Sequence, residues 1–155
     1  MRTQENNKVY TQEKLKAILA KCRKQIKSPE TRQEAIHILD QLDSSTMDPE
    51  NKTEFLYVNG RYNYYLHKDN GDIEALEWSL DYLQDMASYA YEHKISLELK
   101  MIYTRAYVLY LLGNLIWDEE RKPWVYAKAK KIAQRMATKY PSNSSFNWLN
   151  SQLEI

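Results

Sequence analysis

The chain has 155 residues, of which 43% are hydrophobic, so its size and composition suit one folded domain with a single core. With only 3 glycines and 4 prolines, it is poor in the residues that tight turns, β-hairpins and phosphate-binding loops require. The formal net charge is +1, and the single cysteine excludes an intramolecular disulfide. These features predict an all-α domain over residues 1–155, built from long helices with short connections.

The N-terminal part of the chain begins with a polar stretch, MRTQENNKVY, which lacks the apolar core of a secretory signal. We therefore expect residues 1–10 to be a flexible N-terminus and the protein to be cytoplasmic. The first predicted helix carries Leu15, Leu19 and Cys22 on one side. This pattern favours a buried structural thiol over a reactive one.

Start and stop signals divide the remaining sequence. Ser28 precedes Pro29 and Asp48 precedes Pro49, and each pair combines a capping side chain with proline at the first helical position. Gly71 can end one helix, while Asp72 and, with less sequence support, Ser96 can cap the next two. Together these signals and the apolar periodicity predict seven helices, over residues 11–26, 29–44, 49–68, 72–93, 96–119, 123–139 and 143–152.

The later helices differ in how they are expected to pack. The helix over 72–93 has two adjoining apolar stripes, which predicts neighbours on two sides. The helix over 96–119 is apolar almost all round, so we expect it at the centre of the core. Residues 142–155 hold a shorter apolar pattern that predicts a C-terminal capping helix.

The most apolar run, Met101–Trp117, is short for a membrane span. It is 17 residues long and contains Arg105 and Asn114. A span needs about 20 predominantly apolar residues, and an arginine in its interior is unfavourable. We therefore expect a buried helix of a soluble domain and no membrane contact.

Small residues recur at similar positions in the predicted helix pairs. Gly60 precedes Ala75 by 15 residues and Gly113 precedes Ala129 by 16, which predicts hairpins whose helices approach closely there, as does the pair Ala20 and Ala35. Several residues also fit the tetratricopeptide-repeat pattern of bulky, Leu, Gly and Ala positions closed by Pro: Leu109, Leu112, Gly113 and Ile116, then Ala129, Ala133, Met136 and Pro141, and in part Ala35, Leu39 and Leu42.

The chain over residues 11–141 thus resembles the tetratricopeptide-repeat family, in which antiparallel helical hairpins stack as a short solenoid. The resemblance implies a protein- or peptide-binding function, with the first helix of each pair lining a concave side. Two departures are clear. The spacing between units here is about 40 and then about 53 residues against 34 in the family, and most units lack the first-helix Trp and Tyr of the family pattern.

Patterns that would carry catalysis or metal binding are weak. Glu34 and His37 form one Glu-x-x-His, but the second pair that a di-iron site needs is missing. The stretch HKDNGDIE superficially matches a calcium loop, yet the acid spacing before the glycine is wrong. We expect no catalytic residue, no metal and no cofactor, with an enzyme built from scattered side chains as an alternative.

Charge is unevenly distributed. Residues 1–32 have a net charge of +6, residues 33–100 of −9 and residues 101–155 of +4. Four basic residues form a helical stripe that is an alternative, basic binding face for an acidic partner or nucleic acid: Lys128, Lys131, Arg135 and Lys139. The near-neutral total and the lack of a nucleic-acid motif make nucleic acid the less favoured partner. Attraction between the terminal and middle helices explains the same pattern without a ligand.

The tyrosine-rich helix over 49–68 gives the main site hypothesis. One face is expected in the core and carries Phe55, Val58, Tyr62, Tyr65 and Leu66. The predicted partner-binding residues project elsewhere and are Tyr57, Arg61, Asn63, Tyr64 and His67. Packing against a neighbouring helix pair is the alternative for Tyr57 and Tyr64. Trp78 shares a face with Asp81 and Asp85, so it is either exposed or part of an interface.

The sequence therefore predicts a non-catalytic module that binds a protein or peptide segment, or that joins copies of itself. Contact with nucleic acid through a basic face is the second hypothesis, and a dispersed enzyme site is the third.

Overall fold

The computed structural model describes residues 9–115 and 121–153, and this part of the chain is helical, with no β-strand. The predicted all-α fold is confirmed. The described elements are α1 (Gln12–Gln25), α2 (Pro29–Asp40), a short 3-10 turn η2 (Ser44–Thr46), α3 (Pro49–Asn70), α4 (Ile73–Glu92), α5 (Leu99–Leu115), α6 (Arg121–Lys139) and α7 (Ser144–Leu153).

Several helix ends follow the predicted signals. The Asp48 carboxylate accepts a hydrogen bond from the Asn51 amide at 2.8 Å, which caps the start of α3. Gly71 ends that helix with a φ of 71°, and the Asp72 carboxylate then caps α4. The hydroxyl of Ser28, in contrast, donates to the Glu30 carboxylate instead of capping α2.

Two predicted boundaries were wrong. The second helix ends at Asp40, because the Asp43 carboxylate accepts a hydrogen bond from the Ser45 amide at 3.0 Å and starts the separate turn η2. The fifth helix begins at Leu99, three residues later than Ser96 would place it. The backbone carbonyl of Glu98 accepts the first amides of that helix, so Ser96 is not its cap.

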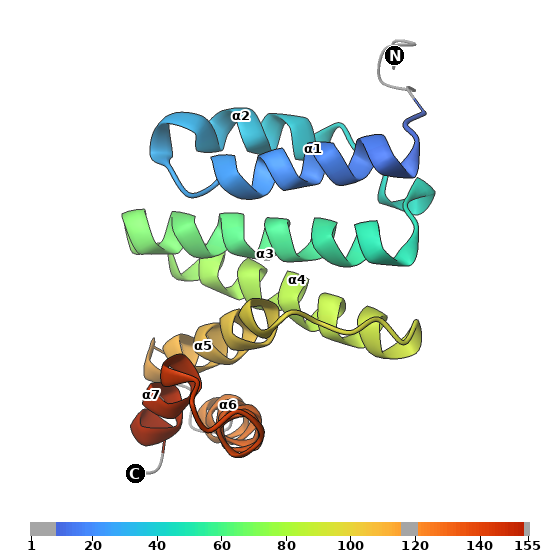
Figure 1. The fold of residues 1–155 in the computed structure, drawn as a ribbon. Coiled ribbons are helices and arrows are strands. Elements are labelled where there is room, and N and C mark those ends of the chain that lie inside the picture. Colours follow the sequence, from blue (N-terminus) through green and yellow to red (C-terminus); the bar gives the residue numbers. More distant parts are fainter. Residues whose placement is uncertain (1–8, 116–120, 154–155) are drawn as a thin grey trace.

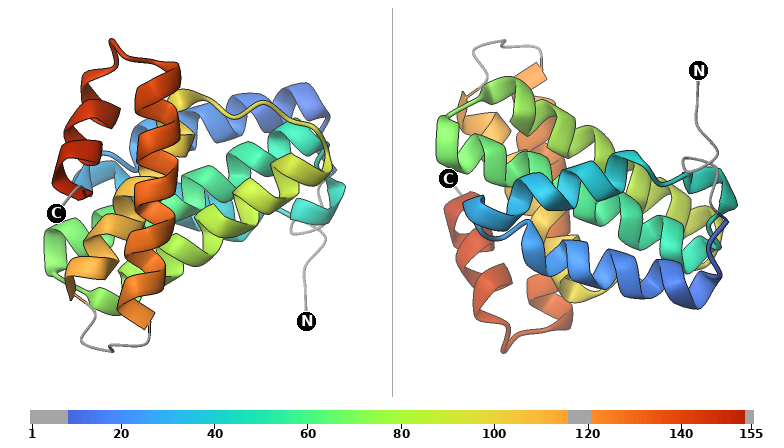
Figure 2. Two further views of the ribbon diagram at one scale, coloured as in Figure 1. Left: turned by 90° about the horizontal axis from the view of Figure 1, so that it is seen from below. Right: turned by 90° about the horizontal axis from the view of Figure 1, so that it is seen from above.

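The helices pack in consecutive pairs, as predicted for helical hairpins: α1 with α2, α3 with α4, and α5 with α6. Figure 1 shows α1 and α2 at one end, α3 and α4 in the middle, and α5 to α7 at the other end. The α6 and α7 helices run at an angle to the middle pair (Figure 2). Among the described residues, no helix is both long and apolar enough to cross a membrane.

The core has two parts that meet at α3. Val58 packs in the smaller cluster with α1 and α2, whereas Leu56 and Tyr57 belong to the larger cluster with α4 to α7. Thus α3, and not α5, lies between both clusters. The fifth helix contributes buried residues such as Leu112, but one of its sides carries half-buried tyrosines instead of being buried all round. Ile116, which we expected in the core, lies outside the described residues.

Small residues do allow close helix contacts, although with other partners than predicted. A Cβ on Gly60 would lie 2.8 Å from Leu83 of α4, and the Ser79 hydroxyl donates to the Gly60 carbonyl at 2.7 Å. Gly113 similarly faces the ring of Tyr126 in α6. Ala20 is exposed, so the corresponding prediction for the first hairpin was wrong.

Candidate partner-binding site

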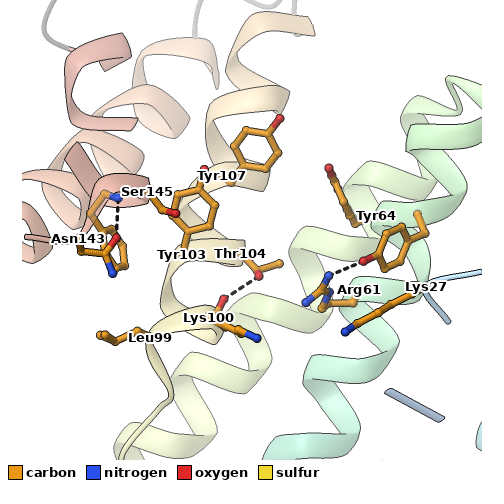
Figure 3. A pocket seen from close by; sticks show the side chains of 12 residues that line it. Lys27, Arg61, Tyr64, Leu99, Lys100, Tyr103, Thr104, Tyr107, Asn143 and Ser145 are labelled. Carbon is orange, nitrogen blue, oxygen red and sulfur yellow. Dashed lines mark hydrogen bonds between the residues drawn. The ribbon is translucent and has the colours of Figure 1, made fainter. Parts of the chain in front are cut away.

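An open cavity of about 630 Å³ lies between α3, α5 and α7, with the end of α1 at its rim (Figure 3). A cavity of this size matches the range of about 300–1,000 Å³ that is common for ligand sites. Its lining combines cationic, aromatic and small polar side chains: Lys27, Arg61, Tyr64, Tyr65, Leu99, Lys100, Tyr103, Thr104, Tyr107, Asn143, Ser145 and Phe146.

The α3 side of the cavity is organised around Arg61. Tyr57, Arg61 and Tyr65 are four residues apart and therefore share one helix face. The Nη1 group of Arg61 donates to the Tyr57 hydroxyl at 3.0 Å, and Nη2 donates to the Tyr65 hydroxyl. Burial lowers the pKa of Arg61, but the two phenols outweigh burial and raise it overall, so the guanidinium remains charged.

The structure brings together some of the five predicted partner-binding residues. Arg61 and Tyr64 both line the cavity. The prediction that Tyr57 projects from an accessible face was wrong, because its side chain is 0% exposed and belongs to the larger core cluster. Its hydroxyl instead holds Arg61 in place, so Tyr57 acts on the cavity indirectly.

Asn63 and His67 are not among the cavity-lining residues. The Asn63 side-chain amide donates to the Asn59 carbonyl on its own helix at 2.9 Å. A ring nitrogen of His67 lies 3.0 Å from the Asp72 carbonyl at the end of α3. Both side chains therefore make local contacts along or at the end of α3, which gives them no evident role in the cavity.

The α5 side was not predicted, because its helix was interpreted as a wholly buried element. Lys100, Tyr103, Thr104 and Tyr107 recur at intervals of three or four residues and face the cavity. The rings of Tyr103 and Tyr107 are stacked, with centroids 5.7 Å apart and planes at 10°. This recurrence is the sequence signal that could have identified the second wall.

Tyr64 connects the two walls. Its ring makes an edge contact with Tyr107, with centroids 6.0 Å apart. Burial, followed by the neighbouring Tyr107, raises the pKa of Tyr64 to about 12. Tyr64 is therefore a neutral, amphipathic wall residue at physiological pH, with part of its side chain accessible.

Acidic residues lie next to the cavity but are engaged elsewhere. Arg23 of α1 pairs with Glu54 at 3.1 Å and with Glu98 at 2.9 Å. Burial raises the pKa of Glu54, while Arg23 opposes that shift. A second depression, which shares Lys27 and Lys100 with the cavity, contains this ion-pair cluster.

The predicted basic face on α6 is present as a surface. Lys131, Arg135 and Lys139 are exposed, whereas Lys128 is half-buried with its Nζ 5.4 Å from the ring centre of Trp124. Trp124 itself is 51% exposed. Trp78 is 54% exposed on α4, which agrees with a free surface position and with an interface position alike. The α6 face therefore stays an alternative to the cavity as the binding surface.

The other candidate sites, a lone thiol and a metal site, have less structural support than the cavity. Cys22 is fully buried, as predicted, and burial raises the pKa of its thiol. No group of three or more His, Cys, Asp and Glu residues in the described ranges could hold a metal ion. Comparisons with protein-family models, with curated proteins and with solved structures find no match to this chain.

Proposed function

We propose that the protein is a non-catalytic binding module that holds a segment of a partner protein or peptide in the cavity between α3, α5 and α7. The observation that carries this proposal is that the charged side chain of Arg61 lines the cavity without a described carboxylate partner. Its guanidinium is fixed by two phenols and lines an open cavity, and no ion pair is found for it among the described residues. Partly buried charges usually have a partner of opposite charge.

The character of the walls supports a macromolecular partner. Tyrosine and arginine dominate the energetics of protein interfaces, because they combine a large contact area with directional hydrogen bonds. Here Tyr64, Tyr103 and Tyr107 supply the rings, and Arg61 supplies the charge.

The position of the cavity agrees with the resemblance to tetratricopeptide repeats. In that family, the first helices of the pairs line the concave side, and here α3 and α5 provide most of the lining. Membership in the family and a cytoplasmic location are parts of the same proposal.

A capture experiment with a matched control tests it. A tagged protein carrying Tyr64→Ala and Lys100→Glu is expected to remain folded, although with a lower melting temperature because the Tyr64 ring packs against Tyr107, and to lose the partners that the wild type captures from its host. Lys131→Glu makes the same charge change on the α6 face and is expected to capture normally.

Loss of capture by Lys131→Glu, together with normal capture by the cavity variant, would place the site on α6 and contradict the proposal. Salt-sensitive retention on DNA by wild type but not by that control would then favour the nucleic-acid hypothesis.

A further inference from the structure

Arginine and tyrosine side chains alternate beside α3 in the order Arg23, Tyr57, Arg61, Tyr65 and Arg32, which we call the Arg–Tyr row. Each guanidinium carbon lies between 4.8 and 5.7 Å from the centre of a neighbouring ring in the row. Such distances are typical of cation–π contacts. The row therefore ties α1 and α2 to α3 through stacked side chains.

The two ends of this row differ from its centre. Arg23 is paired with two glutamates, and Arg32 is paired with Asp69 and donates to the Ile26 carbonyl at 2.8 Å. Arg61, in the middle, contacts only phenol hydroxyls among the polar partners described, and its buried Nε–H has no acceptor. The central arginine thus has hydrogen-bonding capacity and charge that the described protein groups do not use.

Further positive charge lies around Arg61. Lys27 and Lys100 are exposed residues of the same cavity, and none of its described lining residues is aspartate or glutamate. Figure 3 shows Lys27 and Arg61 on the α3 side, with Lys100 and Thr104 across from them. Three cations around one open space favour an anionic occupant.

The walls of the cavity also provide an aromatic surface. The stacked rings of Tyr103 and Tyr107 and the edge of Tyr64 form an aromatic surface next to the cations, and the buried Phe146 supports it by packing edge-on against Tyr103. A space of about 630 Å³ is much larger than a single inorganic oxyanion needs and suits a group with an apolar body.

We propose that this cavity recognises an aromatic ring that carries an oxyanion, with the anion on Arg61, Lys27 and Lys100 and the ring against Tyr103 and Tyr107. The inference rests on the proposed binding function and names the chemistry of its ligand. A guanidinium fork binds phosphate or carboxylate through paired hydrogen bonds, and aromatic faces stack on the attached ring. The oxyanion is either on an aromatic side chain of a bound segment or on a free aromatic acid.

Titration calorimetry on the full chain can separate ring from charge. Phenyl phosphate carries both features, inorganic phosphate only the charge, and phenol only the ring. We expect phenyl phosphate to bind at least about tenfold more tightly than either single-feature probe, because both sets of contacts form together. Equal affinity for phenyl phosphate and inorganic phosphate would overturn the proposal.

Substitutions then locate the binding. Arg61→Gln is expected to weaken phenyl phosphate about tenfold and to leave phenol unchanged, because it removes a charge-assisted hydrogen-bonding group. Should that variant fail to fold, Lys100→Gln provides the same comparison at an exposed position. Arg135→Gln on α6 is the matched control and should bind as the wild type does. Unchanged binding by a folded Arg61→Gln, or by Lys100→Gln when it stands in, would contradict the assignment.

One further probe, a short peptide containing phosphotyrosine, tests the source of the anion. A short peptide containing phosphotyrosine that binds more tightly than phenyl phosphate indicates a protein segment, whereas equal affinities indicate a free aromatic acid. Both outcomes support the ring-and-anion assignment, and a free aromatic acid would contradict the proposed binding of a protein segment. If no aromatic anion binds while capture of a partner still depends on Tyr64 and Lys100, this inference fails and the proposed binding function stands.

Discussion

Gly60 offers a quantitative test of how closely α3 and α4 pack. In Gly60→Ala the new Cβ would lie 2.8 Å from both Cγ and Cδ2 of Leu83, where carbon atoms prefer about 3.5–4.0 Å. Leu83 is 0% exposed and cannot rotate into solvent, so the helices must separate or Leu83 must change rotamer. Overpacking of this kind costs about 1–3 kcal/mol, while alanine in a helix interior gains about 1 kcal/mol over glycine.

We therefore expect Gly60→Ala to lower the free energy of unfolding by up to about 2 kcal/mol, the overpacking cost minus the helix gain, which is a melting-temperature decrease of up to about 8 °C for a domain of this size. Gly113→Ala is the matched control, because its Cβ would meet the ring of Tyr126, which is half-buried, whereas Leu83 is fully buried.

Urea unfolding monitored by circular dichroism measures the free energy of unfolding of both variants. The control is expected to change stability by less than about 0.5 kcal/mol, since the helix gain offsets the displaced ring. Adding Leu83→Ala to Gly60→Ala should cost less than the sum of the two single changes, because the clash is removed. A Gly60→Ala protein that is more stable than wild type by about 1 kcal/mol, the full helix gain, would refute the close approach.

Three other outcomes follow from burial. Leu112→Ala is expected to lose about 2–5 kcal/mol of stability in the same urea assay, because Leu112 is fully buried in the larger cluster, and a loss below about 0.5 kcal/mol would contradict that position. The Cys22 thiol should react with Ellman's reagent no faster than the chain unfolds, since it is buried and its pKa is raised; rapid labelling of native protein would contradict this. Tyr64 has a folded pKa of about 12 against about 10 when unfolded, so its contribution to stability is complete below about pH 10 and is lost as the pH rises to about 12. Alkaline unfolding should therefore be shallower for Tyr64→Phe than for wild type, and identical pH profiles would disprove that contribution.

Sequence reasoning predicted the helices well where capping chemistry is local. Asp48, Gly71 and Asp72 each act within one turn of their own position, so their roles follow from neighbouring residues alone. Ser96 failed as a cap, and the residue whose carbonyl accepts the first α5 amides, Glu98, also reaches Arg23 on a distant helix. Contacts across the fold of this kind carry no periodicity that a single segment could reveal.

The candidate site was predicted in part for a related reason. A helical wheel placed Arg61 and Tyr64 off the expected core face of α3, and both line the cavity, but so does Tyr65, which was expected in the core. A wheel cannot say whether another helix covers a given face. Tyr57 is covered by the larger cluster, and four residues further on Arg61 reaches an open space. Whether a wheel position is core or surface depends on where α5 and α7 end relative to α3, which only the assembled fold determines.

Within the Arg–Tyr row, the outer arginines are explained by folding, whereas the central arginine is better explained by binding. If its arginines served only to join α1 and α2 to α3, the outer pair would suffice, since Arg23 and Arg32 already cross between helices and have carboxylate partners. Burying part of a third guanidinium without a counter-ion disfavours the folded state, and phenol hydroxyls offset that penalty less well than a carboxylate does. A bound anion would supply the missing partner for Arg61 and would therefore stabilise the fold as well as occupy the cavity. The guanidinium of Arg61 is thus explained more directly by a bound anion than by packing alone.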